Sequence, residues 1–134
     1  MELQDAWELM EQARAALNHA YVPYSNFPVG AAVRTASGDV YVGANVENAS
    51  YPLTCCAERT AIYAAVNAGH TVIDAVAVTA ANVPTVTPCG GCRQVLNEFK
   101  PADRAMTVIL DGPNLTILTL EELLPRAFGP QDLQ

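Results

Sequence analysis

Two short stretches, Cys56-Ala57-Glu58 and Pro88-Cys89-Gly90-Gly91-Cys92, decide how this chain has to fold. Cys89 and Cys92 are three residues apart, so on one helical turn their sulfurs lie on the same face. If the fold brings Cys56 to them, three thiolates hold a tetrahedral zinc ion and leave its fourth position open. Zinc activates water at such a position, and a carboxylate that is not a ligand can move the protons of that water. We therefore expect one zinc ion per chain on the three cysteines, and Glu58 as the catalytic acid and base.

The composition and charge of the chain narrow its class and its partners. Its 134 residues suit one domain, and a hydrophobic content of 51% is high beside a charged content of 16%. This apolar excess favours an oligomer. The 14 acidic residues exceed the 7 basic ones, for a net charge of −7, and a negatively charged protein repels a polyanion. We expect a single domain over residues 1–134 that acts on a small molecule and does not bind nucleic acid.

The first residues and the cysteines bear on the cellular compartment. Residues 1–5 are acidic and lack the basic segment and apolar run of a secretory signal, and no later stretch is long enough to span a bilayer. We therefore expect a cytoplasmic protein that does not enter a membrane. In a reducing compartment, a Cys-x-x-Cys spacing favours metal binding over a disulfide.

Hydrophobic periodicity divides the chain into helices and strands. Apolar residues at helical spacing predict three long helices, over residues 3–20, 55–68 and 89–99. Thr54 is the candidate N-cap of the second helix and Gly69 its stop, and Thr119 to Glu122 form a capping box that opens a short last helix. Runs rich in β-formers predict strands over residues 29–35, 40–46, 72–80, 106–110 and 115–118. This order predicts an α/β fold, a three-layer α/β/α sandwich with a mixed central sheet of about five strands.

Two features upstream of the first metal motif are candidates for substrate binding. Asn45 and Glu47 are two residues apart, so on a continuing strand both side chains point to the same side. They form either an exposed strand end or, as we favour because the metal motif follows, a polar patch that binds hydroxyl groups. The loop over residues 21–28 carries three aromatic rings and two prolines. These rings either fix the loop to the core or form a wall for a flat substrate.

A zinc site of three thiolates needs positive charge nearby. Three thiolates and Zn²⁺ leave a net charge of about −1, which makes the metal a weaker acid for water than a histidine site does. Helix N-termini offset part of this charge, and Arg59 and Arg93 either donate hydrogen bonds to the thiolates or are exposed helix arginines. A closed structural site would need a fourth ligand. On a helix, the side chain of Cys55 points about 100° away from that of Cys56, so both are not expected to reach one ion. The two histidines lack a ligand-like spacing. We therefore expect no fourth protein ligand.

The same residues give the chain a family resemblance. A ligand-x-Glu followed by Pro-Cys-x-x-Cys is the signature of zinc deaminases, and the chain carries it in its two metal motifs. Nearly the whole chain is similar to the small homotetrameric cytidine deaminases, through the blocks Tyr24–Ala32, Asn45–Tyr51, Cys56–Ala61 and Leu123–Phe128. Gly91 is one departure, because relatives often carry alanine between the paired cysteines.

The resemblance implies roles for individual residues. For the metal, it implies ligation by Cys56, Cys89 and Cys92, proton transfer by Glu58, and relief of the thiolate charge by Arg59. For the substrate, it implies ribose binding by Asn45 and Glu47, packing of Phe27 on the pyrimidine, and a base contact from the backbone N–H of Ala57. From neighbouring subunits, it implies contributions by Tyr51 and Phe128.

The reaction that the resemblance implies is zinc-dependent hydrolytic deamination of cytidine and 2′-deoxycytidine to uridine and 2′-deoxyuridine, with release of ammonia, in pyrimidine salvage. It also implies the cytidine deaminase-like form of the α/β/α fold and a homotetramer with shared active sites. Two other interpretations fit the metal motif. One is a zinc deaminase of another aminated heterocycle, which would use Asn45 and Glu47 differently. The other is a noncatalytic module with a structural zinc and no open position.

Overall fold

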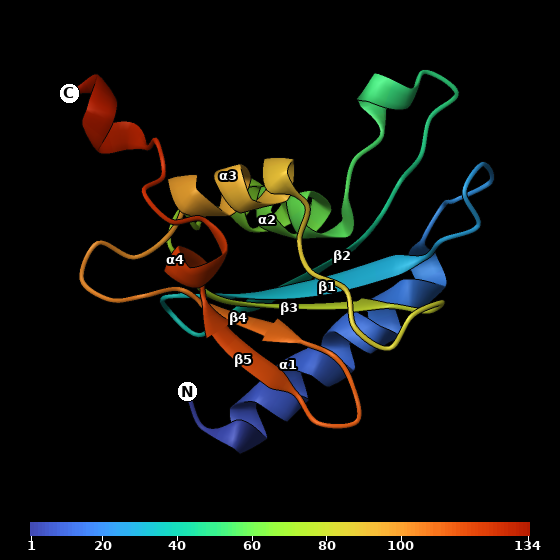
Figure 1. The fold of residues 1–134 in the computed structure, drawn as a ribbon, viewed down its shortest axis with the longest axis horizontal. Coiled ribbons are helices and arrows are strands. Elements are labelled where there is room, and N and C mark those ends of the chain that lie inside the picture. Colours follow the sequence, from blue (N-terminus) through green and yellow to red (C-terminus); the bar gives the residue numbers. More distant parts are fainter.

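The computed structural model describes residues 1–134, and Figure 1 shows how its elements follow one another. The elements, with 3₁₀ helices labelled η, are α1 (Leu3–Ala16), η1 (Leu17–His19), β1 (Val29–Thr35), β2 (Val40–Ala44), η2 (Tyr51–Leu53), α2 (Ala57–Asn67), β3 (Ile73–Ala80), α3 (Gly90–Glu98), β4 (Thr107–Leu110), β5 (Thr116–Thr119), α4 (Leu120–Leu123) and η3 (Pro130–Leu133). None of the helices combines the length and the apolar character needed to cross a bilayer.

The five strands form one mixed sheet in the order β2-β1-β3-β4-β5. β1 is antiparallel to both β2 and β3, β4 is antiparallel to β5, and β3 and β4 are parallel. A parallel pair requires a crossover connection, which α3 provides between its two strands. The predicted mixed sheet is confirmed.

Helices cover both faces of this sheet, α1 on one face and α2 with α3 on the other (Figure 1). The residues of a strand alternate between the two faces accordingly. In β3, Ala75 and Ala77 pack against α1, whereas Val76 and Val78 belong to the cluster that contains the buried residues of α2 and α3. Both faces are therefore buried, and the chain has the predicted three-layer α/β/α architecture.

Helix α2 approaches the edge strand of the sheet closely at Gly43. A Cβ atom at this position would lie 2.2 Å from Thr60 Oγ1 and 2.4 Å from the backbone nitrogen of Ala61, so only glycine fits. The Thr60 hydroxyl oxygen lies 2.9 Å from Ala44 O and 2.8 Å from Ala57 O, and it donates to these carbonyls. Strand β2 and the first turn of α2 are thus joined directly.

Helix α2 begins two residues later than the sequence predicts. Cys55 exchanges two backbone hydrogen bonds of 2.9 Å with Val46, and this pairing keeps the backbone extended. Cys56 is then the N-cap, with φ −70° and ψ 155°, and Ala57 is the first helical residue. The prediction that Thr54 caps the helix is wrong, because its hydroxyl instead accepts a backbone N–H from the preceding loop.

The other boundaries differ by a few residues. The first α-helix ends at Ala16 and continues as the 3₁₀ turn η1, and β2 ends at Ala44 instead of at residue 46. Gly69, with φ 98°, follows α2 as the predicted stop signal. The capping box of α4 is confirmed, because the Thr119 and Glu122 side chains each accept the backbone N–H of the other residue.

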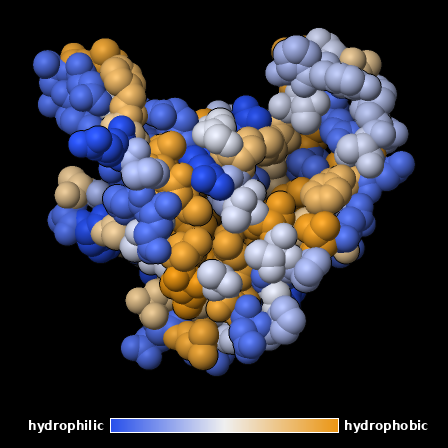
Figure 2. All heavy atoms as spheres, viewed as in Figure 1, coloured by the Kyte–Doolittle hydropathy of each residue, from blue (hydrophilic) through white to orange (hydrophobic).

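Two segments stand away from the body of the molecule (Figure 1). One contains η2, where Tyr51 and Leu53 are 72% and 68% exposed, and the other is the C-terminal segment, where Phe128 is 60% exposed. In Figure 2 the surface is hollowed between these two projections. Large apolar side chains at such positions are candidates for burial against another molecule.

Candidate metal centre and active site

The three cysteines of the metal motifs come together at the starts of two helices. Cys56 is the N-cap of α2, Cys89 is the N-cap of α3, and Cys92 lies in the first turn of α3. Their sulfur atoms all lie within 4.8 Å of one another, and Cys56 Sγ is 3.9 Å from Cys89 Sγ. Zn–S bonds of about 2.3 Å in a tetrahedron place two sulfurs about 3.8 Å apart. The donor set and its spacing therefore fit a zinc ion.

Positive charge reaches this cluster from two sources. The N-terminal ends of α2 and α3 carry partial positive charge at the cysteines. Arg59 Nη2 donates a hydrogen bond of 3.1 Å to Cys56 Sγ, and the Arg59 Nε–H is buried without an acceptor. Hydrogen bonds from the Cys92 thiol and from Arg59 lower the pKa of Cys56 to about 5 despite its burial. The Cys56 thiol therefore ionises readily at neutral pH, as a metal ligand must.

Glu58 lies in the first turn of α2 and is only 4% exposed. Burial raises the pKa of its carboxyl to about 7, and the negative charge of Cys56 contributes to the rise. A carboxyl whose pKa lies near neutral pH can both accept and donate a proton. Glu58 is also not among the clustered metal donors, which leaves its carboxyl free for this exchange.

Two adjoining cavities lie beside the cysteines. The smaller one, of about 170 Å³, is lined by five residues that the sequence analysis singled out, namely Asn45, Cys56, Ala57, Glu58 and Cys89. The larger one, of about 420 Å³, is lined by Tyr24, Ser25, Glu47, Tyr51 and Thr54. Thr54 lines both, so the two cavities share this residue as a wall.

Asn45 and Glu47 lie beyond the end of β2 and bind the aromatic loop. Val29 N–H donates to Asn45 Oδ1 over 3.0 Å, and Asn45 Nδ2 donates to Phe27 O over 2.8 Å. Glu47 Oε1 accepts the N–H of Ser25 over 3.1 Å and that of the preceding residue over 3.0 Å. The Ser25 hydroxyl also donates to Glu47 and lowers the pKa of its carboxyl, which is therefore ionised. The regular strand ends before Asn45, but Val46 still forms β-bridges with Tyr21 and Cys55, so the strand continues only as isolated pairing. The two polar side chains form a patch, and this patch holds the loop in place.

Arg93 and Phe128 lie outside the cysteine cluster. Arg93 Nε donates to Pro88 O and its Nη1 to Leu123 O, both over 2.8 Å, so the hypothesis that Arg93 donates to a thiolate is wrong. The guanidinium instead fixes the turn that leads into Cys89. The carbonyl of Phe128 accepts hydrogen bonds from two side-chain amides of α3, whereas its ring is exposed and lines neither cavity.

Sequence reasoning missed part of the wall of the smaller cavity. Val29, Val78, Val86 and Thr87 complete its lining. Val86 and Thr87 belong to the loop after β3, and their place just before Pro88 is the one signal that points to them. Val29 and Val78 lie in apolar strands, where periodicity shows which residues are buried but not which of them border a cavity.

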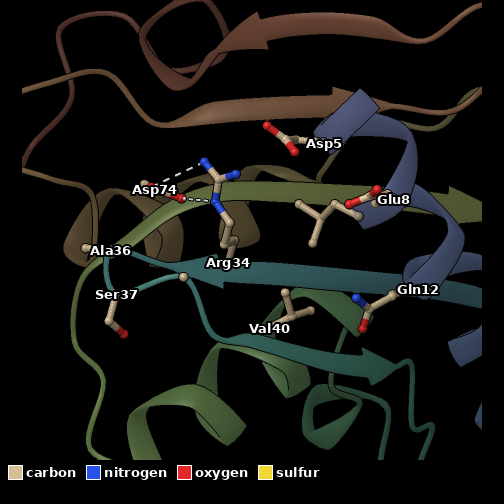
Figure 3. A pocket seen from close by; sticks show the side chains of 10 residues that line it. Asp5, Glu8, Gln12, Arg34, Ala36, Ser37, Val40 and Asp74 are labelled. Carbon is tan, nitrogen blue, oxygen red and sulfur yellow. Dashed lines mark hydrogen bonds and ion pairs between the residues drawn. The ribbon is translucent and has the colours of Figure 1, made fainter. Parts of the chain in front are cut away.

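A third cavity, of about 470 Å³, borders α1 (Figure 3). Asp5 and Glu8 of α1 line it together with Arg34 of β1 and Asp74 of β3. Arg34 Nε donates to Asp74 Oδ1 over 2.9 Å, so the basic group of this cavity is already paired. Its acidic side chains form no cluster of three metal donors. The chemistry of the molecule is therefore concentrated at the cysteines.

The chain resembles known proteins over nearly its whole length. Residues 3–108 match the family model described as "Cytidine and deoxycytidylate deaminase zinc-binding region". The chain is 46% identical over 129 residues to the cytidine deaminase of Halalkalibacterium halodurans, and the aligned region covers 96% of this chain and 98% of the relative. It is 41% identical over 128 residues to the cytidine deaminase of Mycobacterium tuberculosis, and the aligned region covers 95% of this chain and 92% of the relative.

Solved structures agree with these sequence matches. The crystal structure of cytidine deaminase from Burkholderia pseudomallei has a TM-score of 0.83 and 44% identity, covering 91% of this chain and 98% of that one. The crystal structure of cytidine deaminase from Mycobacterium tuberculosis has a TM-score of 0.79 and 40% identity, covering 93% of this chain and 98% of that one. The family match includes all three candidate ligands, Cys56, Cys89 and Cys92. Both structural matches extend over at least nine-tenths of the chain. This chain belongs to the cytidine deaminase family.

Proposed function

We propose that this protein catalyses the zinc-dependent hydrolytic deamination of cytidine and 2′-deoxycytidine to the corresponding uridines, with release of ammonia. The observation that carries the proposal is the buried carboxyl of Glu58, which lines the same small cavity as two of the three clustered cysteines, Cys56 and Cys89. A structural zinc site has four protein ligands and makes no use of a buried carboxyl group. The arrangement therefore favours a catalytic site over a noncatalytic zinc module.

The sizes of the two cavities support a nucleoside substrate. The smaller cavity, of about 170 Å³, is below the roughly 300–1,000 Å³ of most ligand pockets and suits a single flat ring. A sugar on that ring would extend into the adjoining cavity, which Glu47 lines. We assign Asn45 and Glu47 to the 3′-hydroxyl and Phe27 to the face of the pyrimidine. The N–H of Ala57, which has no partner within α2 because it opens the helix, is assigned to the base.

Glu58 carries the protons in the proposed reaction. A zinc ion held by the three cysteines would lower the pKa of a water molecule and so supply a nucleophile for C4 of the base. Glu58, with a pKa of about 7, accepts a proton from the attacking water and donates it to N3. It then takes the second proton of the same oxygen, from the new hydroxyl on C4, and delivers that proton to the departing amine as the C4–N bond breaks. Arg59 offsets part of the thiolate charge through its hydrogen bond to Cys56.

The charge of Glu47 favours nucleosides over nucleotides. Its carboxylate is ionised and lines the cavity assigned to the sugar, where a phosphorylated sugar would meet a like charge. We therefore expect 2′-deoxycytidine to be a better substrate than deoxycytidylate. Equal kcat/KM values for the two compounds would contradict this expectation.

The test of the proposed reaction is the change in ultraviolet absorbance of cytidine on addition of the purified, zinc-loaded protein. Glu58→Gln should keep one zinc per chain and lose at least about 10²-fold in kcat, because it removes the proton carrier. Glu98→Gln, at an exposed position at the end of α3, is the matched control and should behave as the wild type. A wild-type protein that binds zinc but leaves cytidine unchanged would contradict the proposal in favour of another aminated heterocycle or a noncatalytic module.

We further propose that the protein is a cytoplasmic homotetramer that serves pyrimidine salvage and completes its active sites between subunits. The exposed rings of Tyr51 and Phe128, on the two projections beside the hollow in Figure 2, support contact with other copies. The four cysteines form no disulfide, as is usual in a reducing compartment. Sedimentation at equilibrium should give the mass of a tetramer, and a monomer would contradict the shared active site.

A further inference from the structure

The hydroxyl group of Ser25 joins the two sides of the proposed substrate site. It donates a hydrogen bond to Glu47 Oε2, and its oxygen accepts the backbone N–H of Phe27 over 3.1 Å. Glu47 lines the cavity assigned to the sugar, and Phe27 is assigned to the base. One exposed side chain therefore touches both the carboxylate that would bind the sugar and the backbone of the residue that would pack on the ring.

The loop around Ser25 depends on such side-chain contacts for its shape. Asn26, which lies between Ser25 and Phe27 in the sequence, has φ 55°, a left-handed conformation that asparagine adopts more readily than most residues. Asn82 Nδ2 holds the carbonyl of Asn26 over 2.7 Å, and Asn45 Nδ2 holds that of Phe27 over 2.8 Å. Backbone hydrogen bonds from Asn26 N–H to Val22 O and from Ala81 N–H to Pro28 O also hold the loop, but the Phe27 N–H bonds to the Ser25 hydroxyl oxygen. Loss of this hydroxyl should therefore let the ring of Phe27 shift.

We propose that Ser25 is a positioning residue that couples sugar recognition by Glu47 to base recognition by Phe27, an inference that rests on the proposed function. When the hydroxyl orients the Glu47 carboxylate, the same oxygen fixes the Phe27 N–H, so the two contacts form or loosen together. Ser25 lies on a loop and lines the larger cavity, away from the cysteines and Glu58. Its loss should therefore weaken substrate binding and leave the chemical step unchanged.

Ser25→Ala tests this coupling against Ser37→Ala, which removes the hydroxyl of another exposed serine, in the distant β1–β2 turn. Ser25→Ala should lower kcat/KM for cytidine about tenfold, equivalent to about 1.4 kcal/mol and to one hydrogen bond to a charged group. The change should appear in KM, with kcat within about twofold of wild type. Ser25→Thr keeps the hydroxyl and should restore the wild-type KM. Ser37→Ala should match the wild type.

Two comparisons separate coupling from a general loosening of the loop. With 2′,3′-dideoxycytidine, which lacks the 3′-hydroxyl assigned to Glu47, the loss caused by Ser25→Ala should shrink to about twofold. In a Glu47→Gln background, Ser25→Ala should cause little further loss, because the two residues act as a unit. Equal losses with cytidine and dideoxycytidine, or effects of Ser25 and Glu47 that multiply, would overturn the inference and leave the proposed function intact. A wild-type protein that is inactive on cytidine would overturn the proposed function and the inference with it.

Discussion

Replacing Gly43 with alanine tests whether the contact between β2 and α2 sets the position of the active site. The added Cβ would lie 2.2 Å from Thr60 Oγ1, 2.4 Å from Ala61 N and 2.7 Å from Ala57 O, where ordinary contacts begin at 3.4 Å. Two of these three atoms belong to the backbone, so rotation of a side chain cannot relieve the overlap. Helix α2 has to move away from β2 by about 1 Å.

This movement weakens the fold and the site together. Overpacking costs about 1–3 kcal/mol, and weakening of the Thr60 hydrogen bonds costs about 1 kcal/mol more. We expect the free energy of unfolding to fall by about 3 kcal/mol, which in a chain of this length lowers the melting temperature by about 10 °C. Because Cys56 and Glu58 lie at the start of α2, a shift of about 1 Å should also reduce kcat/KM by about 10²-fold.

Thermal unfolding followed by circular dichroism measures the first effect, and cytidine deamination below the melting range measures the second. Gly91→Ala is the matched control, because a Cβ there meets nothing within 4 Å and the residue lies in the first turn of α3. Alanine at that position should leave stability unchanged or raise it by up to about 1 kcal/mol. If Gly43→Ala melts within about 2 °C of the wild type and keeps its kcat/KM, the close approach of α2 to β2 at Gly43 does not set the position of the helix.

Three further substitutions test the metal site and the fold. Cys89→Ala should abolish stoichiometric zinc binding, measured by mass spectrometry of the metal; retained zinc would remove Cys89 from the ligand set. Arg59→Gln removes the charge beside Cys56 and should lower kcat about tenfold in protein that still contains zinc, and an unchanged kcat would show that the thiolate charge needs no such offset. Burial raises the pKa of Asp111, but hydrogen bonds led by the one from Arg14 outweigh burial and hold that pKa below its ordinary value. Asp111→Asn should therefore cost about 1–2 kcal/mol in urea unfolding at pH 7. This difference should shrink as the pH falls below about 4, the ordinary pKa of aspartate, because the unfolded chain then takes up a proton before the folded carboxylate does, and a constant difference would contradict the assignment.

The features that the sequence predicts correctly depend on local spacing. The Cys89 and Cys92 pair, three residues apart, is brought onto one turn by any helix that starts there. The alternation of apolar residues in β3 and the capping box at Thr119 can likewise be predicted from a few consecutive residues. The layered architecture then follows, because a strand apolar on both faces has to be covered on both.

The features that sequence reasoning got wrong depend on contacts between distant residues. The start of α2 is displaced by the pairing of Cys55 with Val46, which no local cap preference reveals. Glu47 is held by loop residues more than twenty positions earlier, so its strand-like spacing to Asn45 carries no information about its partners. Arg93 follows a ligand in sequence but bonds to the carbonyls of Pro88 and Leu123, and the second of these lies thirty residues further along the chain, where local spacing gives no signal.

Neither α2 nor α3 has a side chain that caps its first turn with a hydrogen bond, whereas the short α4 has a complete capping box. Cys56 and Cys89 occupy the two N-cap positions and are 33 residues apart in the chain. Because their sulfur atoms lie 3.9 Å apart, the N-terminal, partially positive ends of the two helices lie close together. A cluster of thiolates holding a metal ion is then the common cap of both helices. Exchanging one ligand for another residue changes the metal and the end of a helix in a single step, and an engineered ligand set has to satisfy the rules of helix termination as well as those of coordination.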